Sequence, residues 1–201
     1  MKLYNANFSP NALRVRAVAH ELGVDLEIVQ VDIRAGDNRA AEFLARNPNA
    51  KVPVLEDGNF VLWESRAICA YLADVFPEAD LAPQTGQRDQ YYRWLFFGAG
   101  PLEQAVTTVA LGFEIPEDRK GMVGFGCLGD VLDTLEHRLS EHPFLAGDRF
   151  TAADVYTGSQ IGWGLQFGTI PSRSTFAAYW NRIQDRPARL RAAALDAEAA
   201  A

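Results

Sequence analysis

The fold of this 201-residue chain is decided by the stretch KVPVLEDGNFVLWES, residues 51–65. Its two apolar runs, 52–55 and 60–62, are rich in β-branched and large apolar side chains, and they flank the turn-forming residues 56–59. That pattern is typical of a β-hairpin. Glu64 and Ser65 then open an apolar segment with helical spacing. The stretch therefore predicts a hairpin followed directly by a helix over 65–75.

Upstream of the hairpin, strand and helix patterns alternate. The predicted elements are a strand, a helix, a second strand and a short helix, at residues 2–5, 10–22, 26–32 and 40–46. Ser9 is the expected N-cap of the first helix, Pro10 suits its first turn, and Gly23 ends it. The order β-α-β-α-β-β-α describes a compact α/β unit.

Downstream of the predicted helix over 65–75, the sequence pattern changes. Residues 77–86 are polar, contain Pro and Gly, and predict a linker. From residue 87 onward strand signals almost vanish and amphipathic helical patterns take over. We therefore expect an α/β domain at 1–76, a linker at 77–86 and an all-α domain at 87–201.

Composition excludes several classes of protein. The net charge is −7 with no block of Lys or Arg, which argues against nucleic acid as a partner. No run of about 18 apolar residues predicts a membrane span, and the first residues lack the apolar core of a signal peptide. The two cysteines form no CxxC pair and the three histidines lie apart, so no metal site is expected. These features predict a cytoplasmic protein.

Three local features are candidates for a binding or catalytic role, and each can also be explained by an ordinary structural role. Pro53 is either a trans proline at a strand start or a cis proline that turns the backbone of Val52 outward to pair with an extended peptide. Ser65 is either a helix cap or part of a helix start that receives a ligand carboxylate, with Glu64 taking an ammonium. Ser9 is either a cap or a hydroxyl that donates to a sulfur.

In this order, the three features resemble the glutathione transferase superfamily. The resembling segments are residues 8–11, 47–55, 62–68, 144–148 and 150–154. The resemblance implies a thioredoxin-like N-terminal domain and an all-α C-terminal domain. It also implies that Val52, before a cis Pro53, pairs with the cysteinyl unit of glutathione, and that Glu64 and Ser65 hold the γ-glutamyl end. Lys51 and Asn38 are the matching candidates for the glycyl carboxylate.

The resemblance also suggests how the thiol is activated. Ser9 matches the serine-type classes, whereas Asn11 matches members that rely on an asparagine two residues later, and one sequence does not decide between them. Lowering a thiol pKa by two units takes roughly 2.7 kcal/mol. One neutral hydrogen bond contributes about 0.5–1.5 kcal/mol, so the helix dipole must contribute as well.

The implied reaction is conjugation of reduced glutathione, as co-substrate, to a small hydrophobic electrophile by a homodimer without a prosthetic group. The alternatives are reduction of disulfides or peroxides, isomerisation, or a binding module without catalysis. No cysteine lies near Ser9 in the sequence, which argues against disulfide exchange as the activity.

The second half carries less information. Phe113 and Trp163 are the candidates for the electrophile pocket, although aromatic residues at helical spacing usually belong to a core. Thr151 and Asp154 match a capping box, which is a folding motif. Cys69 lies in an apolar segment and is expected to be buried and inert.

Overall fold

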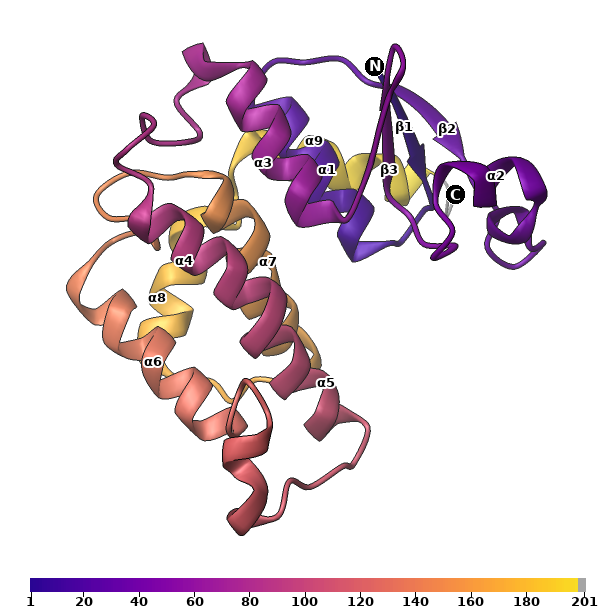
Figure 1. Cartoon of the computed structure of the whole chain (residues 1–201). Helices are drawn as coiled ribbons and strands as arrows, with labels where there is room; N and C mark the ends of the chain where they lie inside the picture. Colours follow the sequence, from indigo (N-terminus) through magenta and orange to yellow (C-terminus); the bar gives the residue numbers. More distant parts are fainter. Residues whose placement is uncertain (199–201) are drawn as a thin grey trace. The chain divides into compact units, whose positions relative to one another are not determined.

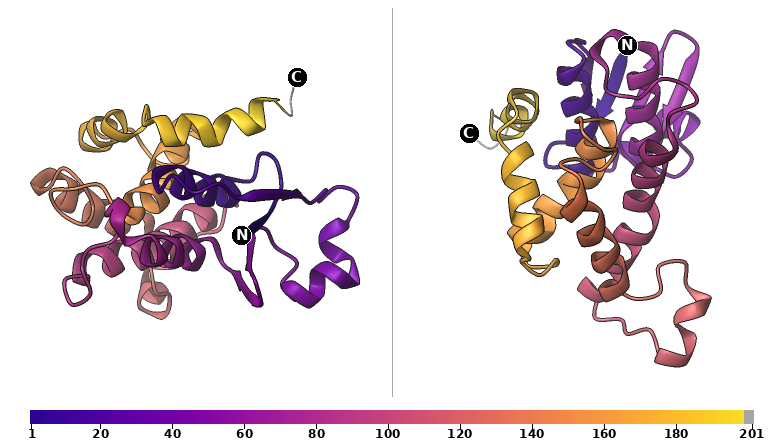
Figure 2. Two further views of the ribbon diagram at one scale, coloured as in Figure 1. Left: turned by 90° about the horizontal axis from the view of Figure 1, so that it is seen from above. Right: turned by 90° about the vertical axis from the view of Figure 1, so that its left-hand side faces the viewer.

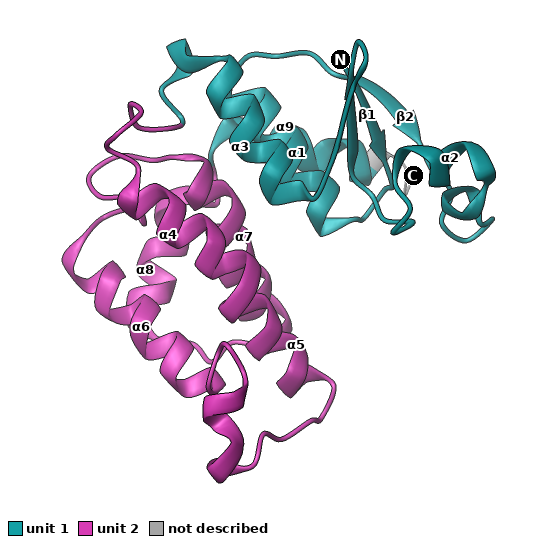
Figure 3. Cartoon of the chain, viewed as in Figure 1, with its two compact units in different colours: residues 1–81, 186–201 teal, residues 82–185 magenta. Residues whose placement is uncertain are grey.

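Contacts divide the chain into two compact units (Figure 3). The computed structural model describes residues 1–198. The first unit comprises residues 1–81 together with the segment from Arg186 onward, and the second comprises residues 82–185. The C-terminal segment therefore packs with the first unit, whereas the sequence analysis assigned it to the helical half.

The first unit is built on a four-stranded mixed sheet with the order β2-β1-β3-β4 (Figure 1). The strands are β1 (Lys2–Asn5), β2 (Glu27–Gln30), β3 (Val54–Asp57) and β4 (Phe60–Trp63). β1 runs parallel to β2, and β3 is antiparallel to both β1 and β4. The predicted hairpin is confirmed, with Val54 opposite Trp63 and Asp57 opposite Phe60.

Helices pack against the sheet of this unit. They are α1 (Pro10–Glu21), α2 (Ala41–Arg46) and α3 (Ser65–Val75), with short 3-10 turns at Asp37–Arg39 and Pro77–Ala79. α1 and α3 lie side by side, and Val15 and Ile68 are fully buried together with the sheet residues Leu3 and Leu55. Phe43 of α2 forms a smaller cluster with Val31 and Val54. The predicted order β-α-β-α-β-β-α is confirmed.

The last helix, α9 (Pro187–Glu198), packs along α1 (Figure 2). Its contact face includes small side chains, and Ala188 and Ala192 are buried. Small residues let two helices approach closely. Arg186, just before α9, makes a two-pronged ion pair with Glu21 of α1, at 2.6 and 2.7 Å. Packing and charge together explain why this segment joins the first unit.

The second unit is built from helices joined by loops, with no β-strand among residues 82–185. Its helices are α4 (Asp89–Phe97), α5 (Glu103–Ala110), α6 (Leu128–Glu141), α7 (Ala152–Phe167) and α8 (Ser174–Ile183). A π-helical turn, Gly98–Leu102, joins α4 to α5, and a 3-10 segment, Glu117–Met122, precedes α6. Gly98 is required where α4 meets α7, because an added Cβ would lie 2.1 Å from Thr157 Oγ1. Within residues 1–198, no helix is long and apolar enough to cross a membrane.

The start of α7 confirms the predicted capping box between Thr151 and Asp154. The fully buried Asp154 carboxylate accepts from the Thr151 N–H and hydroxyl, the Leu145 N–H and the Tyr179 hydroxyl, at 2.8–3.1 Å. Burial raises the pKa of Asp154, and the donated hydrogen bonds oppose that shift. One carboxylate thus ties α7 to α8 and to the loop before it.

Replacing Asp154 by Ala is expected to lower the free energy of unfolding by about 3 kcal/mol, because several buried donors lose their acceptor. Urea unfolding followed by circular dichroism measures this loss. Asp148→Ala, at a side chain that is 96% exposed, is the matched control and should stay within about 0.5 kcal/mol of wild type. Equal stability of the two variants would contradict the role assigned to Asp154.

Candidate functional site

Ser9 lies at the opening of α1, directly after the end of β1. It is the N-cap, as predicted, and its Oγ accepts from the Ala12 N–H at 3.3 Å. Accepting that bond uses a lone pair and leaves the hydroxyl proton free to donate elsewhere. Ser9 is half-buried, so its hydroxyl is held in place and still accessible.

Ser65 lies at the opening of α3, and its hydroxyl donates to Asn11 Oδ1 at 3.0 Å. The same oxygen accepts from Arg14 Nη1 at 2.8 Å. The N-cap of α3 is Glu64, so the capping role considered for Ser65 is wrong: Ser65 is the first residue of the helix, and its side chain reaches α1 instead. The hydrogen bond between Ser65 and Asn11 joins the N-termini of α1 and α3.

Glu64 has a backbone φ of 78°, a region that non-glycine residues rarely adopt. Its carboxylate pairs with Arg66 Nη2 at 2.7 Å, and both side chains are about one-third exposed. An acid and a base therefore stand together at the start of α3. The sequence analysis missed Arg66, although its position two residues after the acid on a helix opening was a usable signal.

The Val52–Pro53 peptide bond is cis. Val52 is half-buried against the Val31, Phe43 and Val54 cluster. Neither its N–H nor its C=O bonds to another backbone group among residues 1–198. Without such partners, both groups could pair with an extended peptide, as the cis alternative requires.

The loop before Val52 is held by two buried amides. Asn38 Nδ2 donates to the Ala50 carbonyl at 2.9 Å, and Asn47 Nδ2 donates to the Lys51 carbonyl at 2.8 Å. Ala50 has a positive φ of 55°, so the chain turns sharply here. Lys51 is exposed beside the turn. Asn38 is therefore engaged in shaping the loop, and the sequence analysis missed Asn47, whose partner is only four residues away.

These elements offer complementary chemistry within the first unit. The two linked helix N-termini present backbone N–H groups and positive dipole ends, which favour a carboxylate or a thiolate. The Val52 backbone can pair with a peptide, and Lys51 and Arg66 supply cations. Among the described residues, no three His, Cys, Asp or Glu side chains gather as a metal ion would require. The arrangement suits a small peptide that carries an anionic group.

Comparison with known proteins identifies the family. Residues 1–74 match the model of the glutathione S-transferase N-terminal domain, and residues 123–187 match that of the C-terminal domain. The chain belongs to the glutathione S-transferase family. Glutathione S-transferase 3 from Zea mays is 34% identical over 201 residues, covering 94% of this transferase and 90% of the maize protein.

Solved structures agree with this assignment. A glutathione transferase from Methylococcus capsulatus is 33% identical with a TM-score of 0.79, covering 98% of each chain. A transferase from Phanerochaete chrysosporium in complex with oxidized glutathione is 25% identical with a TM-score of 0.80, covering 98% of this chain and 96% of that one. The expected thioredoxin-like first domain and all-α second domain are therefore the fold of this transferase.

The two candidates for an electrophile pocket differ in their surroundings within the second unit. Phe113 is 63% exposed and lines a cavity of about 390 Å³ together with Val109, Ile115, Phe125 and Cys127. Trp163 is half-buried and its ring packs on that of Phe167, with centroids 5.2 Å apart. Phe113 thus has a cavity beside it, whereas Trp163 does not line that cavity.

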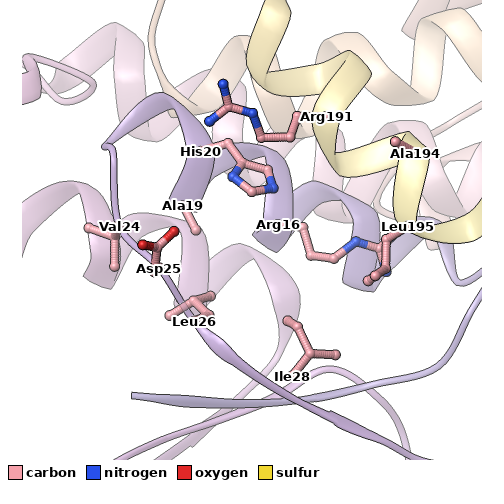
Figure 4. Close-up of a pocket in the computed structure, with 10 residues that line it drawn as sticks. All are labelled: Arg16, Ala19, His20, Val24, Asp25, Leu26, Ile28, Arg191, Ala194 and Leu195. Carbon is pink, nitrogen blue, oxygen red and sulfur yellow. The ribbon is translucent and has the colours of Figure 1, made fainter.

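A second cavity, of about 280 Å³, lies in the first unit between α1, β2 and α9 (Figure 4). Its lining combines the apolar Leu26, Ile28 and Leu195 with the basic Arg16 and Arg191. None of the residues predicted to bind glutathione lines it.

The two cysteines are in different environments. Cys69 is fully buried, and burial raises the pKa of its thiol to about 12. Its predicted burial is confirmed. Cys127 is partly exposed and is the N-cap residue of α6. Because the thiolate is the reacting species, the two should differ strongly in reactivity.

At pH 8, the native protein is expected to give one rapidly reacting thiol with a chromogenic disulfide reagent, and two after denaturation. The fast thiol should disappear in Cys127→Ser and persist in Cys69→Ser. Rapid labelling of native Cys127→Ser would show that Cys69 is accessible and would contradict its assignment as an inert core residue.

Proposed function

We propose that this transferase binds reduced glutathione on its first unit and conjugates the glutathione sulfur to a small hydrophobic electrophile. The observation that carries the proposal is the bond between Ser65 and Asn11. It brings two helix N-termini together in the unit that also contains the cis Val52–Pro53 bond. Membership of the family, and relatives named glutathione S-transferases over most of the chain, support the same activity.

Each part of the tripeptide would contact a different group of the first unit. Its cysteinyl backbone pairs with the N–H and C=O of Val52, as in strand addition. Its γ-glutamyl end carries both charges of an amino acid, so the carboxylate meets the α3 N-terminus at Ser65 and the ammonium meets Glu64. Arg66, which pairs with Glu64, adds a second cation for that carboxylate. Lys51 takes the glycyl carboxylate, and Asn38 contributes by holding the preceding loop.

Ser9 and Asn11 each keep a donor for the sulfur, and we assign the stabilisation of the thiolate to Ser9 because its hydroxyl caps α1 directly after β1. Ser9 Oγ already accepts from the Ala12 N–H, so its proton is free to donate to sulfur. The Asn11 oxygen is occupied by Ser65 and Arg14, which leaves its amide NH₂ as the second donor. The thiol proton leaves to solvent, and the positive end of α1 stabilises the sulfur anion that remains.

The reaction then needs no group beyond the two substrates. The thiolate attacks an electrophilic carbon, a thioether bond forms, and a leaving group such as chloride departs with its electron pair. Proximity and the larger thiolate population account for the acceleration. Phe113, beside its cavity, and Trp163 remain our candidates for contacts with the electrophile. We place this activity in the cytosol, where glutathione keeps thiols reduced.

Ser9→Ala should lower kcat/KM for a chlorinated aromatic substrate by roughly 10- to 100-fold, the effect of losing one hydrogen bond to a charged group. Calorimetric titration with reduced glutathione should still show binding. Ser9→Thr, which keeps the hydroxyl and the cap, is the control and should retain most activity. If Ser9→Ala and Asn11→Ala both keep full activity, the thiol-activation model is wrong.

We also propose that the transferase forms a homodimer. Edge strand β4 carries three partly exposed apolar side chains, Phe60, Val61 and Trp63, and Phe60 stacks on Tyr71 of α3 at 4.9 Å. Apolar edges of this kind are normally covered in a soluble protein.

Sedimentation equilibrium should therefore give twice the chain mass for the wild type at micromolar concentration. Phe60→Glu is expected to weaken the dimer at least tenfold, because it places a charge in an apolar contact. Leu190→Glu, at an apolar side chain of similar exposure on α9, serves as the control and should leave the mass unchanged. A monomeric wild type would rule the dimer out.

A further inference from the structure

The turn that carries Ser9 is held by a residue from the far end of the chain. Phe8 directly precedes Ser9, has a left-handed φ of 63°, and exposes most of its side chain. Its backbone N–H donates to Asp196 Oδ1 of α9 at 3.1 Å. Because Phe8 exposes most of its side chain, the backbone just before the Ser9 hydroxyl is restrained by this bond together with the bond from the Ser9 N–H to the Ala6 carbonyl at 3.2 Å.

The carboxylate of Asp196 is itself fixed. Its Oδ2 accepts from Arg16 Nη2 of α1 at 2.7 Å, and the two side chains are 12% and 2% exposed. Arg16 Nη1 donates to Asn5 Oδ1 at the end of β1, and Asn5 Nδ2 donates to Gln30 Oε1 of β2 at 3.0 Å. Figure 4 shows Arg16 reaching from α1 toward the turn of α9 that carries Leu195. These hydrogen bonds connect Asn5 and Phe8, at the two ends of the turn between β1 and α1, through Arg16 and Asp196.

We propose that Asp196 is a positioning residue for thiol activation: it holds the Phe8 N–H and Arg16 together and thereby sets the direction of the Ser9 hydroxyl. This inference rests on the proposed role of Ser9. Asp196 does not touch glutathione in this scheme. It acts through the backbone, so its loss should change the pKa of the bound thiol as well as stability.

The same pair of helices supplies a matched control. Glu21 of α1 pairs with Arg186 next to α9 at 2.6 and 2.7 Å, at the opposite end of α1 from Ser9. This ion pair also fastens the C-terminal segment to α1. Glu21→Gln therefore loosens the docking of α9 without removing the restraint on Phe8.

The experiment compares Asp196→Ala, Asp196→Asn and Glu21→Gln, each also in the Ser9→Ala background. The readouts are the pKa of bound glutathione from thiolate absorbance, kcat/KM for a chlorinated aromatic, and the melting temperature. Asp196→Ala should raise the thiol pKa by about one unit, which means about tenfold less thiolate below that pKa, and lower kcat/KM about tenfold. In the Ser9→Ala background it should cause no further loss of activity, because it acts through Ser9.

Asp196→Asn keeps an oxygen for the Phe8 N–H and loses the charge toward Arg16, so a smaller change in thiol pKa is expected, again absent in the Ser9→Ala background. If Asp196→Ala does not fold, Asp196→Asn is the variant that tests the proposal. Glu21→Gln should lower the melting temperature and leave the thiol pKa at the wild-type value. A wild-type thiol pKa in both Asp196 variants, or equal losses of activity with and without Ser9, would overturn the positioning role. Full activity of Ser9→Ala alone would instead overturn the proposed role of Ser9, on which this inference rests, and would leave the proposed glutathione conjugation standing.

Discussion

The hydrogen bond from Ser65 to Asn11 is the constraint on which the proposed site depends. It connects two helices that begin 55 positions apart, and it aligns their positively polarised ends at one edge of the sheet. Without it, each opening would be an ordinary helix N-terminus. With it, the N–H groups of two helix openings lie near one another, and in the proposed site the Val52 backbone beside the cis Val52–Pro53 bond pairs with the peptide.

Much of the first unit was predictable because its signals are local. The hairpin, the cap at Ser9 and the bounds 65–75 of α3 follow from turn chemistry and periodicity within a few residues. The capping box at Thr151 could be predicted for the same reason. The isomer of the Val52–Pro53 bond was left open by the residues themselves and was implied by the family resemblance.

Two kinds of feature were not predicted. The first is a contact between residues that are distant in the sequence, and the second is a choice between structures that fit the same local spacing. Ser65 matched a cap pattern, yet its hydroxyl bonds to Asn11 across 54 residues. The hydrogen bond from the Asn38 amide to the Ala50 carbonyl was not predicted either, and the contact of Asn38 with a ligand stays a prediction. The segment from Arg186 onward was assigned to the helical half, and only its packing on α1 and the pairing of Arg186 with Glu21 show which unit it joins.

The docking of α9 on α1 also bears on how the protein is made. The first unit consists of residues 1–81 and the segment from Arg186 onward, with more than one hundred residues between them. Domains usually fold as they leave the ribosome, starting from the N-terminus. In this chain the first unit can be completed only after residues 82–185 have been synthesised, because Asp196, the partner of the buried Arg16, follows them in the sequence.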